Sequence, residues 1–336
     1  MKKGLFYTTL LLALWSCSNE SGPDVSGIKV DATINRFDKD FFSMDTSKIE
    51  ASMDALETRY SYFVRDFVQF IVLGSAPDSV VSPAVRAGQY FAVTKPLYDS
   101  IRGRFENLSG LTKDFEDGFK HVKYYFPAYK LPKIVTYSGL IGDPSVGLTK
   151  ETLIIGLQMF AGRDFGPYNT LEAQQVFPLY ISRRFEPEYI LPNSFQNIAM
   201  DIYPLNFEGK SLVDQMVEKG KQWYLLDKFL PKVHDTLKTG YAGRQLTWVE
   251  NNEGVVWNFL LKNTDLYTTD QNTVQSYLGE APKTEGMPDD SPGNIGQWIG
   301  WQIVKAFAEK NEGLSPEQIM QTDARKIFEG SKYKPR

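Results

Sequence analysis

The sequence predicts an α+β fold that is mostly helical and contains one small sheet. Apolar residues recur at intervals of three and four over stretches such as 46–74 and 210–230, which is the spacing of amphipathic helices. Two short runs, 131–137 and 152–157, combine β-branched residues with nearby proline or glycine and therefore predict strands. Because 42% of the 336 residues are hydrophobic and 14% are aromatic, the chain can bury a large core.

The N-terminus has the pattern of a secretory signal. Lys2 and Lys3 precede an apolar run over 5–15 that is too short to span a bilayer comfortably. Residues 14–17 resemble a bacterial lipobox, in which Cys17 becomes the lipidated first residue of the mature protein. Because Cys17 is the only cysteine of an exported chain, its expected role is anchorage. The alternative is an ordinary cleaved signal whose cysteine is incidental.

The composition of the chain after the signal peptide limits the kinds of partner that it can bind. Removing the signal peptide, residues 1–16, takes away Lys2 and Lys3 and leaves 35 basic against 41 acidic side chains, a net charge of −6. This charge argues against a nucleic-acid partner, since such proteins present basic surfaces. Residues 17–27 are rich in small and polar residues and predict a flexible tether between the lipid and the fold.

The first half of the chain mixes predicted strands and helices. Ile28, Val30, Ala32 and Ile34 alternate with polar residues, which predicts a half-buried strand. The run 152–157 is apolar on both faces, which suits a strand next to the core. The elements expected in this half are strands at 28–35, 131–137 and 152–157 and helices at 46–74, 83–93, 94–105 and 112–126.

Helices dominate the second half. The segment 295–304 is apolar nearly all round, which predicts a buried helix, and Gly296 and Gly300 permit close packing there. Ser315 before Pro316 predicts the N-cap of a terminal helix. The other helices expected in this half lie at 188–203, 210–230 and 243–262.

Two consecutive helices of the second half, 188–203 and 210–230, resemble the layout of a zinc-peptidase active site without its ligands. Such a site needs two histidines one turn apart on one helix, with a glutamate beside the first. The chain has only His121, expected on a solvated face, and His234, expected to be structural at a helix start. We therefore expect residues 28–330 to form a single degenerate zincin-like domain that binds without catalysis.

Three polar side chains on these two helices are candidates for a vestigial cleft. Asn197 and Asp201 lie one turn apart, and Glu218 on the next helix could approach them. Oxygen ligands suit calcium, magnesium or manganese, so one hypothesis is a metal-dependent hydrolase. The other is that the two carboxylates pair with basic side chains or face water. The register is open, because Gln196 and Met200 have the same spacing.

The strand at 152–157 is the candidate for peptide binding. In zinc peptidases an edge strand beside the metal helix adds extended substrate to the sheet, and this recognition needs no catalytic group. A scaffold that has lost its metal could keep that function. The residues of the candidate strand are Thr152, Leu153, Ile154, Ile155, Gly156 and Leu157.

Five short motifs follow the lipobox in a fixed order, at 35–38, 155–160, 183–189, 218–221 and 296–301. Together they resemble the GldB gliding-motility lipoprotein family of Bacteroidetes over nearly the whole mature chain. That family is similar in turn to predicted zinc-dependent proteases. The resemblance implies a cell-envelope lipoprotein that supports gliding and the associated protein secretion, with no established catalytic activity.

Two classes of function therefore remain. The first is a lipid-anchored protein that contacts the membrane through its lipid, binds other envelope motility or secretion proteins, and uses no cofactor or metal. The second is the metal-dependent hydrolase with ligands Asn197, Asp201 and Glu218. Residues 18–21 lack the acidic run that resembles a surface-export signal in these bacteria, so a periplasm-facing position is expected.

Overall fold

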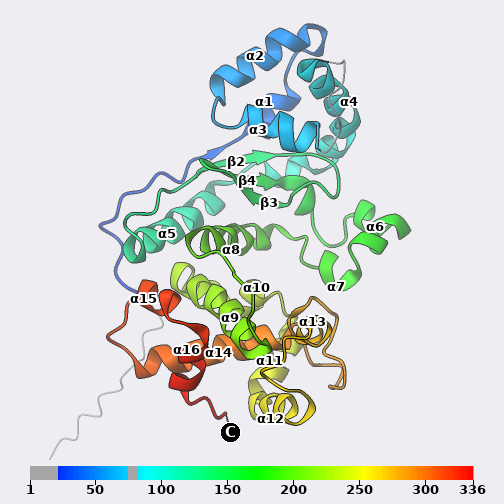
Figure 1. Cartoon of the computed structure of the whole chain (residues 1–336). Coiled ribbons are helices and arrows are strands. Elements are labelled where there is room, and N and C mark those ends of the chain that lie inside the picture. The colour runs from blue at the N-terminus through cyan, green and yellow to red at the C-terminus, as the bar shows by residue number, and fades with distance from the viewer. Residues whose placement is uncertain (1–21, 75–81, 336) are drawn as a thin grey trace, which may run out of the picture.

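The computed structural model describes residues 22–74 and 82–335, and it has the predicted α+β architecture (Figure 1). One four-stranded sheet lies between an N-terminal group of helices and a larger helical part. The signal peptide and Cys17 lie outside the described residues. Within those two described ranges, no helix has the length and apolar character needed to cross a membrane.

The sheet has the strand order β1-β2-β4-β3. β1 (Ile34–Asn35), β2 (Lys133–Tyr137) and β4 (Thr152–Gly156) are parallel, whereas β3 (Val146–Leu148) pairs antiparallel with β4. β4 has a strand on each side, and all of its residues are buried. The expectation that this apolar run lies next to the core is confirmed.

Alternation of side chains along β2 and β4 gives the protein a hydrophobic cluster on each face of the sheet. One face packs against the N-terminal helices and the other against the larger helical part. The residues on the first face are Val135, Tyr137 and Ile154, and those on the second are Ile134, Leu153 and Ile155. The two clusters therefore meet at the sheet.

The N-terminal layer is built around Phe37. The rings of Tyr60, Phe63 and Phe67 surround it edge-on, with centroid distances of 5.3, 5.0 and 4.8 Å. The elements of this layer are α1 (Phe37–Phe42), a 3-10 turn (Thr46–Lys48), α2 (Ile49–Arg59), α3 (Val64–Asp66), a π-helical turn (Phe67–Val72), α4 (Pro83–Ile101) and a second 3-10 turn (Arg102–Phe105).

Three sequence expectations fail in this part of the chain. The helix expected at 46–74 breaks at Tyr60, which turns so that its ring packs on Phe37 and its hydroxyl donates to Asp40. The two helices expected at 83–93 and 94–105 are one, α4, which continues through Pro96. The strand expected at 28–35 is reduced to the two residues of β1, because the preceding segment has no ladder partner among the described residues.

Of the expected tether, residues 17–27, the structure describes 22–27, most of which are exposed. Two of these residues lie against the fold. Gly22 lies against His121, and the side chain of Val25 is only 7% exposed. Burial of the apolar Val25 side chain holds this part of the segment in a fixed position, which its amino-acid composition alone does not indicate.

On the other face of the sheet lie α5 (Ser109–Tyr125) and α8 (Ile190–Ile202) (Figure 1). They approach closely at Gly118, where an added Cβ would lie 2.3 Å from Cζ of Phe195. The chain between β4 and α8 forms 3-10 turns (Leu157–Met159, Gly166–Asn169 and Pro187–Tyr189) and two short helices, α6 (Leu171–Val176) and α7 (Leu179–Ser182). In Figure 1, α6 and α7 project to one side.

The C-terminal part is organised by α9 (Leu212–Phe229) and α14 (Ile295–Lys310). They cross at Gly220 and Gly300, where a Cβ added to Gly300 would lie 1.7 Å from the Met216 carbonyl oxygen. The expectations of a buried helix at 295–304 and of close packing at its glycines are confirmed. The remaining helices are α10 (Asp235–Thr239), α11 (Gly243–Asn251), α12 (Glu253–Asn263), α13 (Gln271–Leu278), α15 (Pro316–Gln321) and α16 (Ala324–Ser331).

The first turn of α9 depends on Asp214. This carboxylate accepts hydrogen bonds from the Ser211 hydroxyl at 2.6 Å, from the Ser211 N–H at 3.3 Å and from Arg325 on α16 at 2.7 Å. Burial alone would raise the pKa of Asp214, but the hydrogen bonds from Arg325 and Ser211 outweigh it and lower the pKa. The ionised form therefore stabilises the fold.

We expect Asp214→Ala to lower the free energy of unfolding by about 1–2 kcal/mol at neutral pH. Because the folded-state pKa is lowered, this stabilisation is complete above the ordinary pKa of 3.8 and is lost as the pH falls through the folded-state pKa. Urea unfolding of both proteins at neutral and acidic pH measures the difference. A gap between wild type and variant that persists unchanged in acid contradicts the electrostatic explanation.

Candidate functional site

The candidate site is a cavity of about 360 Å³ between α8, α9 and the sheet edge at β3, here called the α8–β3 cavity. α8 contributes three residues from one face of the helix. Asn193, Gln196 and Asn197 are spaced at i, i+3 and i+4, so they share a side of the helix and line the cavity. The opposite side buries Phe195 and Ile198 in the core.

The wall of the cavity combines side-chain amides with aromatic rings. The amides are Asn193, Gln196, Asn197, Asn294 and Gln297, and the rings are Phe160, Phe177, Phe185, Tyr189 and Trp223. Asn197 donates to the Asn193 carbonyl at 2.9 Å, and Gln297 donates to the Leu278 carbonyl at 2.7 Å. Within the described structure, the side chains of Asn193 and Gln196 form no hydrogen bond. The cavity therefore presents unused donors and acceptors.

The charged side chains at the cavity are paired. Arg184 binds Glu280 at 3.1 Å, and Lys238 binds Asp235 at 2.7 Å and Asp227 as well. Burial would lower the pKa of Lys238, but the two carboxylates outweigh it and raise the pKa. Among the cavity-lining residues that the structure describes, every charge thus has a partner of opposite sign.

The structure places the three residues of the predicted vestigial cleft in different surroundings. Asn197 lines the cavity. Asp201 is exposed near the end of α8 and accepts a hydrogen bond of 2.8 Å from the Tyr129 hydroxyl. Glu218 is 2% exposed and is bound by lysines. The alternative in which the carboxylates pair with basic side chains or face water is confirmed. The prediction that Asn197, Asp201 and Glu218 form one set of oxygen ligands is wrong, because only Asn197 lines the cavity.

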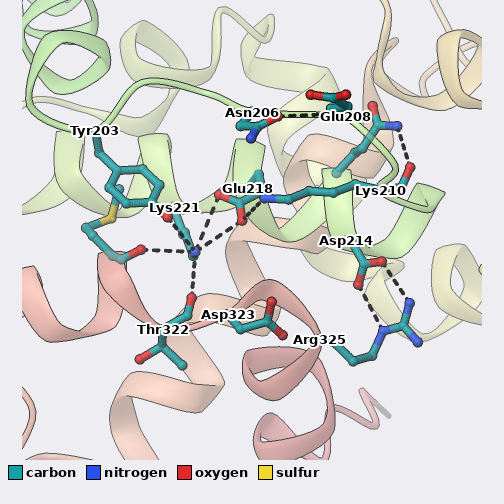
Figure 2. A network of polar contacts seen from close by, with 12 residues as sticks. Tyr203, Asn206, Glu208, Lys210, Asp214, Glu218, Lys221, Thr322, Asp323 and Arg325 are labelled. Atoms are coloured by element: carbon teal, nitrogen blue, oxygen red, sulfur yellow. Dashed lines mark hydrogen bonds and ion pairs between the residues drawn. The ribbon is translucent and has the colours of Figure 1, made fainter.

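Figure 2 shows the network that holds Glu218. Its carboxylate binds Lys210 at 2.7 Å and Lys221 at 3.3 Å. Lys221 is fully buried and also donates to the carbonyls of Met320 and Thr322, at 3.1 and 2.7 Å, where α15 ends. Burial lowers the pKa of Lys221, and the Glu218 charge opposes this shift. The network therefore joins α9 to the C-terminal helices.

The prediction that a peptide binds along the strand at residues 152–157 is wrong. β4 is hydrogen-bonded to β2 on one side and to β3 on the other, and Leu157 belongs to a 3-10 turn. An added peptide needs unpaired backbone groups, which an interior strand does not offer. The edge strand next to α8 is β3, and Ser145 and Val146 at its start line the cavity.

Neither histidine lines the cavity. His121 is 3% exposed, so the expectation of a solvated face is wrong. It is covered by the N-terminal segment, in which Gly22 lies between His121 and Pro231. His234 is the N-cap of α10 and accepts a hydrogen bond from the Thr236 N–H at 3.2 Å, which confirms its structural role.

Comparison with known proteins identifies the family. The family model described as "Gliding motility protein GldB" matches residues 18–335. The chain belongs to this lipoprotein family. No curated protein and no solved structure matches it. The family resemblance found in the sequence is thereby confirmed, and the cavity and the Glu218 network both lie within the matched region. The protein is therefore a gliding-motility protein.

Sequence reasoning missed most of the cavity. A signal did exist on α8, where Asn193, Gln196 and Asn197 place three amides on one face of a helix whose other face is apolar. Glu280 and Gln297 carried no such signal. They reach the cavity only because the packing of α14 on α9 brings the chain after α13 back toward α8.

Proposed function

We propose that this gliding-motility protein is lipid-anchored through Cys17, faces the periplasm, and binds an extended peptide segment of an envelope partner in the α8–β3 cavity without catalysis. The observation that carries the proposal is that the unused amides of Asn193 and Gln196 line the same cavity as Ser145 and Val146 at the start of the edge strand β3. An extended peptide needs hydrogen-bond partners for its own amides on each side, and an edge strand with a facing amide row supplies both.

The lining also defines the chemistry of the peptide. Since Arg184, Glu280 and Lys238 are all paired, a charged side chain entering the cavity would find no counter-ion. Aromatic walls such as Trp223 and Phe177 favour apolar or aromatic side chains. The proposed ligand is therefore a neutral peptide segment that carries apolar side chains.

The same lining supports binding rather than hydrolysis. Peptide hydrolysis needs a general base or an activated nucleophile beside the scissile bond. Glu280, the one carboxylate among the described lining residues, is held by Arg184. The hydroxyls of Ser145 and Thr239 also line the cavity, but both histidines of the chain lie elsewhere. The partners are expected among the motility or secretion proteins of the envelope.

A variant that places a charge in the cavity tests this proposal. We expect Gln196→Lys to reduce recovery of the envelope partner from detergent-solubilised membranes by roughly tenfold or more, because burying the ammonium without a counter-ion is costly. A photo-reactive amino acid at position 196 should crosslink to the same partner. Colony spreading of the gliding host should fall with partner recovery.

Asn272→Lys is the matched control, because this amide lies on the exposed surface of α13 and does not line the cavity. It should leave partner recovery, crosslinking and spreading unchanged. The proposal fails if Gln196→Lys is folded by thermal unfolding and yet recovers the partner and spreads like the control. It fails equally if position 196 crosslinks to no envelope protein while an exposed position does.

A further inference from the structure

The first described residue, Gly22, limits where the membrane anchor can lie. A Cβ built on Gly22 would lie 3.4 Å from both His121 of α5 and Pro231 after α9, so the segment is seated on the fold. Cys17 precedes it by five residues. A fully extended chain spans at most about 3.6 Å per residue, so the anchor lies within about 18 Å of Gly22. This step rests on the proposed lipidation of Cys17.

The surface beside Gly22, here called the Gly22 face, contains a depression of about 670 Å³. Lys228 of α9 and Lys305 of α14 both line it. In the described ranges neither lysine forms an ion pair, although the charge of Lys305 acts on Asp227, and each ammonium lies over an aromatic ring. Lys228 is 5.1 Å from the centroid of Tyr224, and Lys305 is 4.4 Å from that of Trp301.

The other charges of this depression are mostly neutralised. Lys232 pairs with Asp117 at 3.2 Å, and Lys238 pairs with Asp235 and Asp227. Glu250 is the one acidic lining residue in the described structure that has no basic partner. Counted over the described lining residues alone, four lysines (Lys228, Lys232, Lys238 and Lys305) face three carboxylates (Asp227, Asp235 and Glu250), so the lining carries one net positive charge although the chain as a whole is net negative.

We propose that the Gly22 face docks on the headgroup layer of the membrane that holds the anchor, with Lys228 and Lys305 binding anionic phospholipid headgroups. The short reach from Cys17 keeps this face near the bilayer, and lysines near a membrane surface are attracted to anionic lipids. In Figure 1 the chain enters beside α5 and α15, whereas α6 and α7 project on the opposite side. The α8–β3 cavity shares Lys238 with this depression but extends to Ile181 of α7, so that end of the cavity is left open to a partner.

A site-specific probe tests this orientation in the acylated mature protein. Acylation blocks the thiol of Cys17, the only native cysteine, so an introduced cysteine can be labelled alone. Glu250→Cys reports from the Gly22 face, and Glu172→Cys on α6 is the matched exposed glutamate away from it. Each labelled protein is placed on phosphatidylcholine vesicles, with or without phosphatidylglycerol, that carry a quencher on the lipid headgroup.

With phosphatidylglycerol, the probe at 250 should be quenched and the probe at 172 should not. Adding Lys228→Gln and Lys305→Gln should weaken the docked state on the order of tenfold while the protein still floats with the vesicles. Equal quenching at both positions overturns the orientation, as does quenching at 250 that is insensitive to the lysines and to phosphatidylglycerol. Protein that does not float and labels at Cys17 overturns the lipid anchor itself, whereas peptide binding in the α8–β3 cavity is measured independently.

Discussion

Replacing Gly300 with alanine is expected to lower the free energy of unfolding by about 3 kcal/mol or more. The added Cβ would lie 1.7 Å from the Met216 carbonyl oxygen on α9, and that atom is part of a helix backbone that cannot move alone. The two helices would have to separate, and the core between them would lose its close packing. Urea unfolding at neutral pH measures the loss.

Gly110→Ala is the matched control, because a Cβ at Gly110 meets nothing within 4 Å in the first turn of α5. There the same substitution should be neutral or stabilise by about 0.5–1 kcal/mol through a lower entropy of the unfolded chain. Gly220→Ala should lower the free energy of unfolding by a similar amount, since its Cβ would lie in the same helix crossing. The double variant should cost less than the sum of the two. A Gly300→Ala protein as stable as the Gly110→Ala protein would contradict the crossing as described.

This crossing illustrates what the sequence could predict. An apolar segment with glycines at 296 and 300 indicates a buried helix in close contact with another, and the structure confirms it. The break at Tyr60 could not be predicted in the same way. Residues 46–74 keep helical periodicity throughout, and the turn is stabilised by contacts with Phe37, which is distant in the sequence. Tertiary packing overrides local pattern there.

For the candidate site, one sequence pattern supported two expectations that conflict. Apolar residues on both faces of 152–157 indicate a strand covered on both sides, and such strands are generally interior in a sheet. A docking strand must instead lie at an edge. The actual edge, β3, has three residues with a glycine at its centre, which gives no clear strand signal. The paired state of Glu218 was partly predictable, because Lys221 lies three residues later on the same helix.

One of the family motifs acquires a structural explanation from the fold. In the motif at 35–38, Asp38 is fully buried, accepts from Arg36 at 2.6 Å and accepts from the Thr136 hydroxyl of β2 at 2.6 Å. This contact ties α1 to the sheet. The motif at 296–301 contains Gly300 of the α9–α14 crossing, and the motif at 218–221 contains both Glu218 and Gly220. Asp38, Glu218, Gly220 and Gly300 join parts of the fold and do not line the α8–β3 cavity. Other motif residues do line it, namely Met159, Phe160, Arg184, Phe185, Tyr189 and Gln297.

The largest electrostatic effect is expected for Glu218→Leu, which should lower the free energy of unfolding by about 3–5 kcal/mol. Its removal leaves the ammonium of Lys221, which is 0% exposed, with hydrogen bonds only to the carbonyls of Met320 and Thr322 and to the Tyr203 hydroxyl. Asp323 still acts on Lys221 through its charge, but in the described structure it forms no ion pair with it. A buried charge without a counter-ion is strongly destabilising. Thermal and urea unfolding measure the loss, and Lys210→Met is the comparison.

Lys210→Met should cost less, about 1 kcal/mol, because the Lys210 side chain is 26% exposed and Glu218 keeps Lys221 as its partner. Glu218→Leu combined with Lys221→Met should recover much of the loss, since removing both charges avoids burying either one alone. If the double variant were instead less stable than Glu218→Leu, the carbonyl contacts of Lys221 would outweigh its pairing with Glu218.

The dependence of stability on pH tests whether the loss in Glu218→Leu comes from the charge of Lys221. In Glu218→Leu the lowering of the Lys221 pKa by burial loses its main opposing charge, and only the smaller effect of Asp323 still opposes it. Between this lowered pKa and the ordinary value of 10.5, the unfolded chain holds more protons than the folded one, so the stability of the variant should rise with pH in the alkaline range. In Glu218→Leu with Lys221→Met the titrating group is gone, so this rise should be absent. A rise of equal size in both variants would assign it to another group.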